Sequence, residues 1–308
     1  DDLAEKTEAF LLNSTPESPF LAVVNLINPH DICYAAIKDF PPQNRPPANV
    51  PEPLYEAIKI PDSLTEEQFF ARYCPPLPDN FEPTKNEPEA IRDLKQLHSF
   101  TIDARDHWTE RDWRLHRWAY HRLTERVDKQ IGKVLDALQR SEVRDNTIIV
   151  FTSDHGEMSA SHRLEHKTVF YEESSNVPLI VWFEGMGNAG KVDDQHLISN
   201  GLDLYPTLCD LAGIKIPESL PGISLAPLLQ GNAKAYHPRK YLILENELGF
   251  MARDTRFKYA LYDNGEELLI DTRNDPGEMF NIAGDPNDEK EQKTLKAYVL
   301  KHVAENGG

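Results

Sequence analysis

The chain has 308 residues, of which 40% are apolar and 27% charged, proportions that are ordinary for a soluble globular protein. Its formal net charge of −18 argues against binding to nucleic acid or to an anionic membrane surface, because both depend on clustered Lys and Arg. No apolar run approaches the roughly 18–20 residues that span a bilayer, and the acidic N-terminus carries no secretory signal, which leaves export open.

Three cysteines, Cys33, Cys74 and Cys209, are widely spaced along the chain. An odd number at such spacing fits neither a disulfide framework nor a zinc site. Cys209 stands in an apolar run and is predicted to be a buried thiol. A bridge between Cys33 and Cys74 stays open, so the redox compartment is undecided.

The first third of the chain alternates predicted structure with a long loop. Residues 3–12 are predicted to form a helix, and the apolar run Phe20–Ile27 has the length of a strand buried on both faces, as in a parallel sheet. That run ends at Asn28-Pro29-His30. Residues 40–87 are rich in proline and predict a substrate-facing loop with a short helix at 65–73.

A helix over 109–139 is the strongest element, because apolar residues recur at steps of three or four. These are Tyr120, Leu123, Val127, Ile131, Val134 and Leu138. Trp113 and Trp118 are predicted to pack rather than to bind ligand. Buried strands follow at 147–151 and 177–183, then a helix at 203–211 capped by Asp203. This alternation predicts an α/β fold with a largely parallel sheet flanked by helices.

The pattern changes after residue 235. Strands are predicted at 241–245, 258–262 and 267–270, with Asn264-Gly265 as a hairpin turn, followed by a helix at 286–304. The chain is therefore predicted to hold an α/β domain over 1–235 and a small antiparallel α+β subdomain over 236–308.

Two predicted strands end in polar residues, and in open parallel sheets ligands bind beyond the carboxyl ends of strands. The first strand runs into His30, and the strand at 147–151 runs into Ser153-Asp154-His155-Gly156. An Asp at such a place suits a cation or a catalytic role, although a loop or capping Asp is the alternative. The following loop adds His162, His166 and Lys167, and a Lys ammonium suits a tetrahedral oxyanion.

The stretch TIIVFTSDHGEMSASHRLEHKTVFYEESSNVPLIV, residues 147–181, closely resembles the sulfatase segment that carries part of a calcium site and the sulfate-binding lysine. Further landmarks resemble the family in the same order along nearly the whole chain: residues 18–30, 120–138, 202–213, 220–225, 256–259 and 274–281. The chain is thus similar to sulfatases of the alkaline-phosphatase superfamily, and most to iduronate-2-sulfatase-like carbohydrate sulfatases.

The resemblance implies roles for individual residues. Asp154 and His155 correspond to ligands of one Ca²⁺, Lys167 to the lysine that holds the sulfate, and His30 to the histidine at the sulfate and leaving-group oxygen. Calcium prefers oxygen ligands, so the Asp154 carboxylate suits it better than the His155 ring nitrogen does. Three more residues are implied to line the substrate pocket: His162, Arg163 and His166.

One part of the family pattern is missing. No cysteine here is followed by Pro-Ser-Arg or Ala-Ser-Arg, the motif that matures to formylglycine, and the family's first metal aspartates have no counterpart. Asp1-Asp2 precede a helix rather than follow a strand. We therefore expect this chain to be the larger, C-terminal part of a sulfatase, with the nucleophile on an upstream segment that completes the site.

The implied activity is hydrolysis of a sulfate ester on a carbohydrate of glycosaminoglycan type, in an exported protein that is periplasmic, lysosomal or secreted. Two alternatives stay open. One is a phosphonate or phosphodiester hydrolase of the same superfamily, since sulfate and phosphate are both tetrahedral oxyanions. The other is a non-catalytic protein that binds sulfated glycans.

Overall fold

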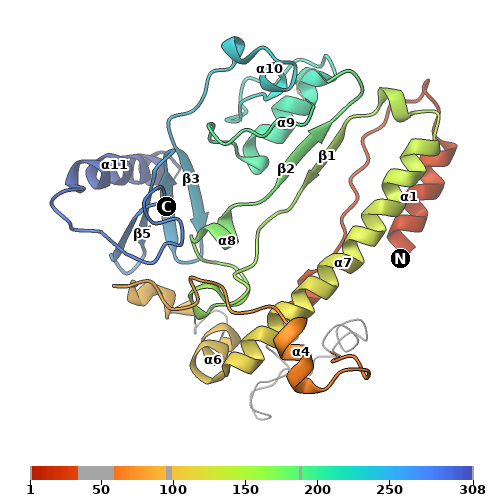
Figure 1. Ribbon diagram of the computed structural model, residues 1–308. Helices are drawn as coiled ribbons and strands as arrows, with labels where there is room; N and C mark the ends of the chain where they lie inside the picture. Colours follow the sequence, from red (N-terminus) through yellow and green to blue (C-terminus); the bar gives the residue numbers. More distant parts are fainter. Residues whose placement is uncertain (1, 34–58, 95–98, 187–188, 307–308) are drawn as a thin grey trace. The chain divides into compact units, whose positions relative to one another are not determined.

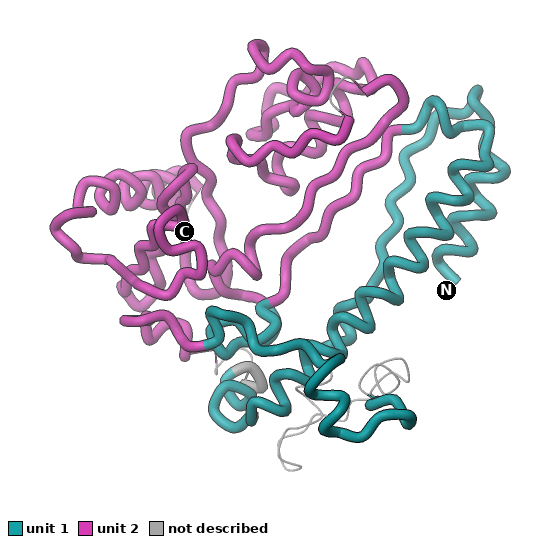
Figure 2. The backbone as a smooth tube through the Cα atoms, viewed as in Figure 1, with its two compact units in different colours: residues 1–81, 95–147, 158–166 teal, residues 82–94, 148–157, 167–308 magenta. Residues whose placement is uncertain are grey.

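A computed structural model describes residues 2–33, 59–94, 99–186 and 189–306 (Figure 1). The chain divides into two compact units, shown in different colours in Figure 2. Unit 1 contains residues 1–81, 95–147 and 158–166, and unit 2 contains residues 82–94, 148–157 and 167–308. The domain boundary predicted at residue 235 stays a prediction, and residues 40–58 of the predicted loop lie outside the described residues.

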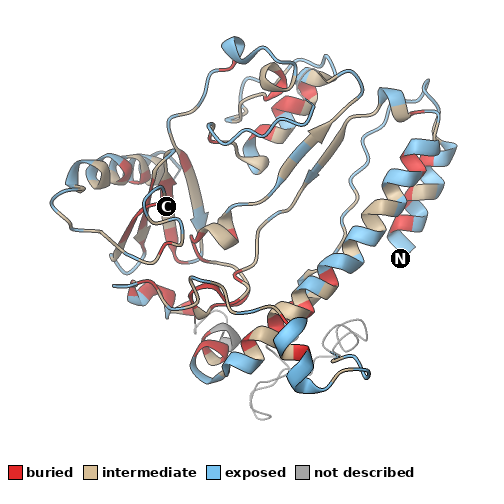
Figure 3. Ribbon diagram, viewed as in Figure 1, coloured by how far each residue is buried: buried red, intermediate tan, exposed pale blue. Residues whose placement is uncertain are grey.

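Unit 1 is built on the long helix α7, Glu110–Arg140, which confirms the strongest sequence prediction. Its start is fixed by a capping box, in which Thr109 and Asp112 each accept a backbone hydrogen bond from the other. Helix α1, Asp2–Asn13, packs along α7 (Figure 1), and Arg140 pairs with Glu8 at 2.6 Å. One face of α7 is buried (Figure 3), through Trp113, His116, Ala119, Leu123, Ala137 and Leu138.

The other helices among the described residues of unit 1 are short: η1 His30–Ile32, α4 Glu66–Arg72, α6 Ser99–His107, η3 Arg144–Asn146 and η4 Ser161–Arg163. Trp113 is buried in a cluster with Ala104 and Ala160, and the ring of Trp108 packs edge-on against it, which confirms its predicted packing role. Cys33 and Cys74 are free and buried, so the structure has no bridge between them.

Unit 2 contains a four-stranded antiparallel sheet that follows the chain order: β3 Leu242–Asn246, β4 Gly249–Arg253, β5 Phe257–Tyr262 and β6 Glu267–Asp271. The predicted Asn264-Gly265 turn joins β5 to β6, with Gly265 at φ +87°. Helix α11, Glu289–Asn306, packs on this sheet through Leu295 and Val299. The antiparallel subdomain is thus confirmed, with β4 as a strand that the sequence did not reveal.

A segment from early in the chain joins this subdomain. Lys85 forms a parallel bridge with Phe280, and Thr84 Oγ1 donates to the Glu278 carbonyl at 2.8 Å. The short helix η2, Glu89–Ile91, follows, and the Ala90 N–H donates to the Glu266 carboxylate at 2.8 Å. Residues 82–94 are therefore an integral part of unit 2.

Strands β1, Ile149–Thr152, and β2, Leu179–Trp182, form a second sheet and pair antiparallel, with Val150 opposite Val181. This corrects the parallel pairing expected of the two strands, because the intervening segment reverses the chain without a crossover. The predicted strand at 20–27 is also corrected: in the described chain these residues lie outside every strand, and Leu21, Val23 and Ile27 are exposed.

Unit 2 also contains the helices α8 Glu172–Ser175, α9 Asn200–Leu211, α10 Ala226–Leu229 and η5 Ala233–Ala235. The N-cap of α9 is Ser199 and not Asp203 as predicted. Asp203 lies one turn later, where it is buried and pairs with Arg239. No helix in the described ranges combines the length and apolar character that a bilayer crossing demands.

Candidate active site

The candidate site begins at the loop that leaves β1, residues 153–157. The Asn200 side chain, at the start of α9, donates to the Ser153 carbonyl at 2.6 Å, and Ser153 Oγ donates to the His155 carbonyl at 2.8 Å. The Gly156 N–H donates to the Ser174 carbonyl at 2.9 Å. A Cβ at Gly156 would stand 1.9 Å from the Glu173 carbonyl oxygen, so only glycine permits this approach.

Asp154 and His155 present their polar atoms side by side, with His155 Nε2 at 3.6 Å from Asp154 Oδ2. The other ring nitrogen, Nδ1, lies 2.8 Å from the Gly156 carbonyl. Because a carbonyl only accepts, Nδ1 carries the proton in the neutral ring and Nε2 keeps a lone pair. An exposed carboxylate oxygen and a ring nitrogen therefore face the same space, which fits part of a divalent-cation site.

The charge of Asp154 is maintained by its surroundings. Partial desolvation raises the pKa of Asp154, but His155, backbone N–H groups of residues 154 and 155, and Lys167 outweigh it and hold the pKa below its ordinary value. Lys167 is half-buried, and its positive charge is close enough to Asp154 to lower the pKa of that carboxylate. Unit 2 therefore brings together Asp154, His155 and Lys167, three of the residues predicted from the sequence.

The other predicted residues belong to unit 1. His162 is fully buried, and its backbone N–H donates to the backbone carbonyl of Asn80 at 2.7 Å. Arg163 stacks over Phe81, with 5.0 Å from the guanidinium carbon to the ring centroid. His30 is exposed at the start of η1. Substrate contacts by His162, Arg163 and His166 stay predictions.

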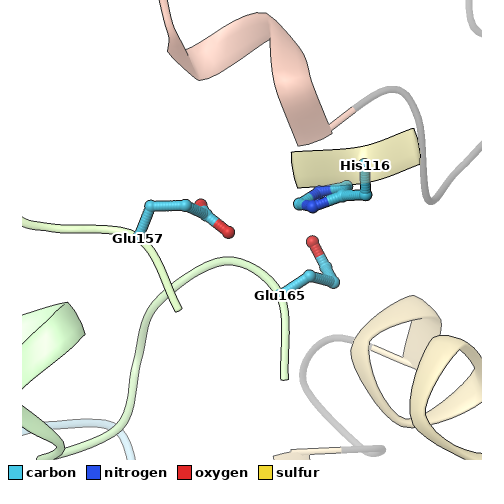
Figure 4. Close-up of side chains that lie close together, drawn as sticks. All are labelled: His116, Glu157 and Glu165. Atoms are coloured by element: carbon cyan, nitrogen blue, oxygen red, sulfur yellow. The ribbon is translucent and has the colours of Figure 1, made fainter. Parts of the chain in front are cut away.

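His116 and Glu165 form a buried pair of titratable residues that could not be predicted from the sequence, because His116 lies on the apolar face of α7. His116 and Glu165 (Figure 4) have ligand atoms within 4.8 Å of one another, and both are buried. Burial lowers the pKa of His116 to about 4, with help from His166 and Arg117 and against the opposing charge of Glu165. Next along the chain, His166 Nδ1 contacts the Glu165 carboxylate. Glu157, also drawn in Figure 4, belongs to unit 2.

Residues 1–214 match the family model described as Sulfatase. The chain belongs to the sulfatase family. Residues 160–305 of this chain also match the model of the C-terminal region of N-sulphoglucosamine sulphohydrolase. The family predicted from the ordered motifs is thereby confirmed.

The curated relatives of this chain include sulfatases. The chain is 36% identical over 289 residues to Delta 4,5-hexuronate-2-O-sulfatase of Bacteroides thetaiotaomicron, covering 89% of this chain and 55% of the relative. It is 34% identical over 199 residues to arylsulfatase K of Gallus gallus, covering 60% of this chain and 37% of the relative. The chain thus spans about half the length, or less, of the curated relatives it matches.

Solved structures agree on the fold. A 2-O GAG sulfatase superposes with a TM-score of 0.81 at 32% identity, over 98% of this chain and 62% of that one. Phosphonate monoester hydrolase of Agrobacterium radiobacter superposes less well, with a TM-score of 0.60 at 27% identity over 74% of this chain and 51% of that one. The α/β fold of the sulfatases is confirmed, and the phosphonate hydrolases are more distant.

Proposed function

We propose that this chain is part of an enzyme that hydrolyses a sulfate ester on a carbohydrate of glycosaminoglycan type. The observation that carries the proposal is the grouping of Asp154, His155 and Lys167 in unit 2. There the imidazole of His155 and the ammonium of Lys167 accompany the ionised carboxylate of Asp154. The 36% identity to Delta 4,5-hexuronate-2-O-sulfatase supports the substrate class. The protein is proposed to be exported, as periplasmic, lysosomal or secreted sulfatases are.

Asp154 and His155 would hold one divalent cation, which we propose to be Ca²⁺. The depressed pKa of Asp154 keeps an anionic oxygen available at neutral pH, and the Nε2 lone pair of His155 faces the same space. Calcium takes six to eight oxygen ligands in general, so further ligands must come from residues outside this pair. The bound cation would supply positive charge beside the sulfate oxygens.

Lys167 would bind the sulfate group. Its ammonium can donate up to three hydrogen bonds to sulfate oxygens and would stabilise charge that accumulates during transfer. His30, exposed in unit 1, would donate a proton to the oxygen of the leaving alcohol. We propose His162, Arg163 and His166 as residues that shape the substrate pocket.

A formylglycine on a segment upstream of this chain would supply the nucleophile, as it does in the family. Within the chain, none of the three cysteines stands in the required motif. The partners implied are therefore the upstream segment and a sulfated carbohydrate. Neither nucleic acid nor an anionic membrane is an expected partner, because of the net charge of −18.

The test is the Lys167→Met variant of the protein that contains this chain, assayed on sulfated disaccharides. We expect kcat to fall about 10²–10³-fold, the usual cost of removing one donor to a developing oxyanion. Lys215→Met, which removes a solvent-exposed lysine of unit 2, is the control and should leave kcat unchanged. Equal effects of the two substitutions, or faster turnover of a phosphonate ester than of any sulfate ester by the unmodified protein, would contradict the proposal.

A further inference from the structure

The side chain of Lys258, in β5, is completely buried and ends against three oxygen atoms. Its Nζ lies 2.8 Å from the Phe170 carbonyl, 2.6 Å from Glu278 Oε1 and 2.6 Å from Glu172 Oε1. An ammonium group has three donors, so each of them is satisfied. A buried charge with this many partners is a specific feature, because an unpaired ammonium in such a place is strongly unfavourable.

The two carboxylates have further partners of their own. Arg253 Nη1 lies 2.8 Å from Glu172 Oε1, which gives the cluster two cations and two carboxylates. Burial raises the pKa of Glu172, but Lys258 and Arg253 outweigh it and lower the pKa to about 2, so this carboxylate is ionised at neutral pH. Glu278 Oε2 accepts from the Glu172 N–H at 2.6 Å. We refer to Lys258, Glu172, Glu278 and Arg253 as the buried ion cluster.

The buried ion cluster holds a particular stretch of backbone, residues 168–172. Lys258 holds the Phe170 carbonyl and Glu278 holds the Glu172 N–H. Asn246, in β3, adds a third tie, because its Nδ2 donates to the Thr168 carbonyl at 3.2 Å. Lys167 immediately precedes this stretch, so the C-terminal sheet fixes the backbone from which the proposed sulfate-binding ammonium projects.

The same stretch continues into the residues that support the other half of the site. Helix α8 begins at Glu172, and its Glu173 and Ser174 carbonyls are the atoms against which Gly156 packs. Gly156 is two residues from Asp154. A displacement of residues 168–174 would therefore move both Lys167 and the loop that carries Asp154 and His155.

From these contacts we infer that Lys258 is a positioning residue of the sulfate and cation site, acting from the C-terminal sheet through residues 168–174. The inference rests on the proposed function, in which Lys167 binds sulfate and Asp154 binds the cation. It states that the buried ion cluster sets the distance between these two residues. Lys258 itself touches neither sulfate nor cation. The cluster is thus more than a stabilising ion pair, because it sets the geometry of a site on another part of unit 2.

The test uses the whole protein that contains this chain, with Ca²⁺ binding measured by calorimetry and kcat and KM measured well below the melting temperature. Lys258→Met keeps the length of the side chain and removes its charge. We expect the Kd for Ca²⁺ to rise and kcat to fall by about 10–100-fold each, the range for groups that orient ligands from outside the site. Lys296→Met is the matched control, because the Nζ of Lys296 instead pairs with Glu267, at 2.6 Å, in the same subdomain. It should change both quantities less than about twofold.

If Lys258→Met does not fold, Asn246→Ala is measured in its place, since it removes the hydrogen bond to the Thr168 carbonyl without leaving a buried charge. A several-fold higher Kd for Ca²⁺ then supports the inference. The inference is overturned if Lys258→Met folds and keeps the Ca²⁺ affinity and kcat of the unmodified protein. If Lys258→Met does not fold, the same result for Asn246→Ala overturns the inference. An unmodified protein that binds no Ca²⁺ and cleaves no sulfate ester overturns the proposed function, and the inference with it. The two failures are therefore distinguishable.

Discussion

The segment between β1 and β2 buries a larger share of polar residues than the C-terminal sheet does. The sheet β3–β6 packs an apolar core of Ala252, Tyr259 and Leu269 against α11. The segment between β1 and β2 buries His162 and Glu165 besides apolar residues such as Met158 and Leu164. Several of its non-glycine residues have positive φ: Ser159, Ala160, His162, Arg163, His166 and Thr168. Non-glycine residues in that conformation are strained. The sheet thus buries mainly apolar residues apart from Lys258 and Asp271, whereas the segment between β1 and β2 also buries His162 and Glu165 and has a strained backbone.

The largest expected effect compares two isoleucines in the two sheets. Ile270 in β6 is 0% exposed, and Ile180 in β2 is 58% exposed. Ile270→Ala should lower the free energy of unfolding by about 2–5 kcal/mol, because it leaves a cavity in the core, whereas Ile180→Ala should cost less than about 1 kcal/mol. Chemical denaturation of the two variants measures the difference. An equal loss for Ile180→Ala would break the comparison by showing that β2 is as buried in solution as β6.

The second prediction concerns pH and the buried His116. Its pKa is about 4 in the folded chain and 6.5 ordinarily, so between these values the unfolded chain binds a proton that the folded chain does not. Stability therefore falls as pH falls through this window, by up to about 3 kcal/mol. His116→Phe should flatten the dependence of unfolding free energy on pH between 6.5 and 4. The exposed His107, replaced in the same way, is the control; retention of the full slope in His116→Phe would assign it elsewhere.

The smallest effect tests the polar ties of the site loop. Asn200→Ala removes the hydrogen bond to the Ser153 carbonyl, next to Asp154. We expect Ca²⁺ affinity to weaken by about 1 kcal/mol, or roughly fivefold, the usual value of one such bond. Asn287→Ala, at an exposed turn near the C-terminus, is the control and should leave the affinity unchanged. A wild-type affinity in Asn200→Ala would mean that the loop holds its shape without this tie.

Local signals in the sequence predicted the elements whose structure is decided locally. The apolar spacing that predicted α7 and the Asn264-Gly265 turn each act within a few residues. The direction of β2 relative to β1 could not be predicted, because an apolar run is the same read in either orientation. Strand β4 was missed because Gly249 and Arg253 flank a short apolar stretch.

The candidate site was predictable where it follows a strand end, as at Asp154 and His155, or where the resemblance supplied a role, as at Lys167. The supporting residues were not. Lys258 gave one signal, a single charge inside an apolar strand, but its partners Glu172 and Glu278 are distant in sequence. Only the folded chain shows which carboxylates meet that charge.

The parallel bridge between Lys85 and Phe280 has a consequence for how unit 2 folds. Strands β3 to β6 pair with their neighbours in chain order, so they can assemble from local contacts, which favours rapid folding. The contact between Thr84 and Glu278 closes 194 residues. Because of lost chain entropy, the free energy of closing so long a loop is about 3 kcal/mol less favourable than that of closing the β5–β6 turn. Docking of residues 82–94 is therefore expected to be a late step, taken on a sheet that has already formed.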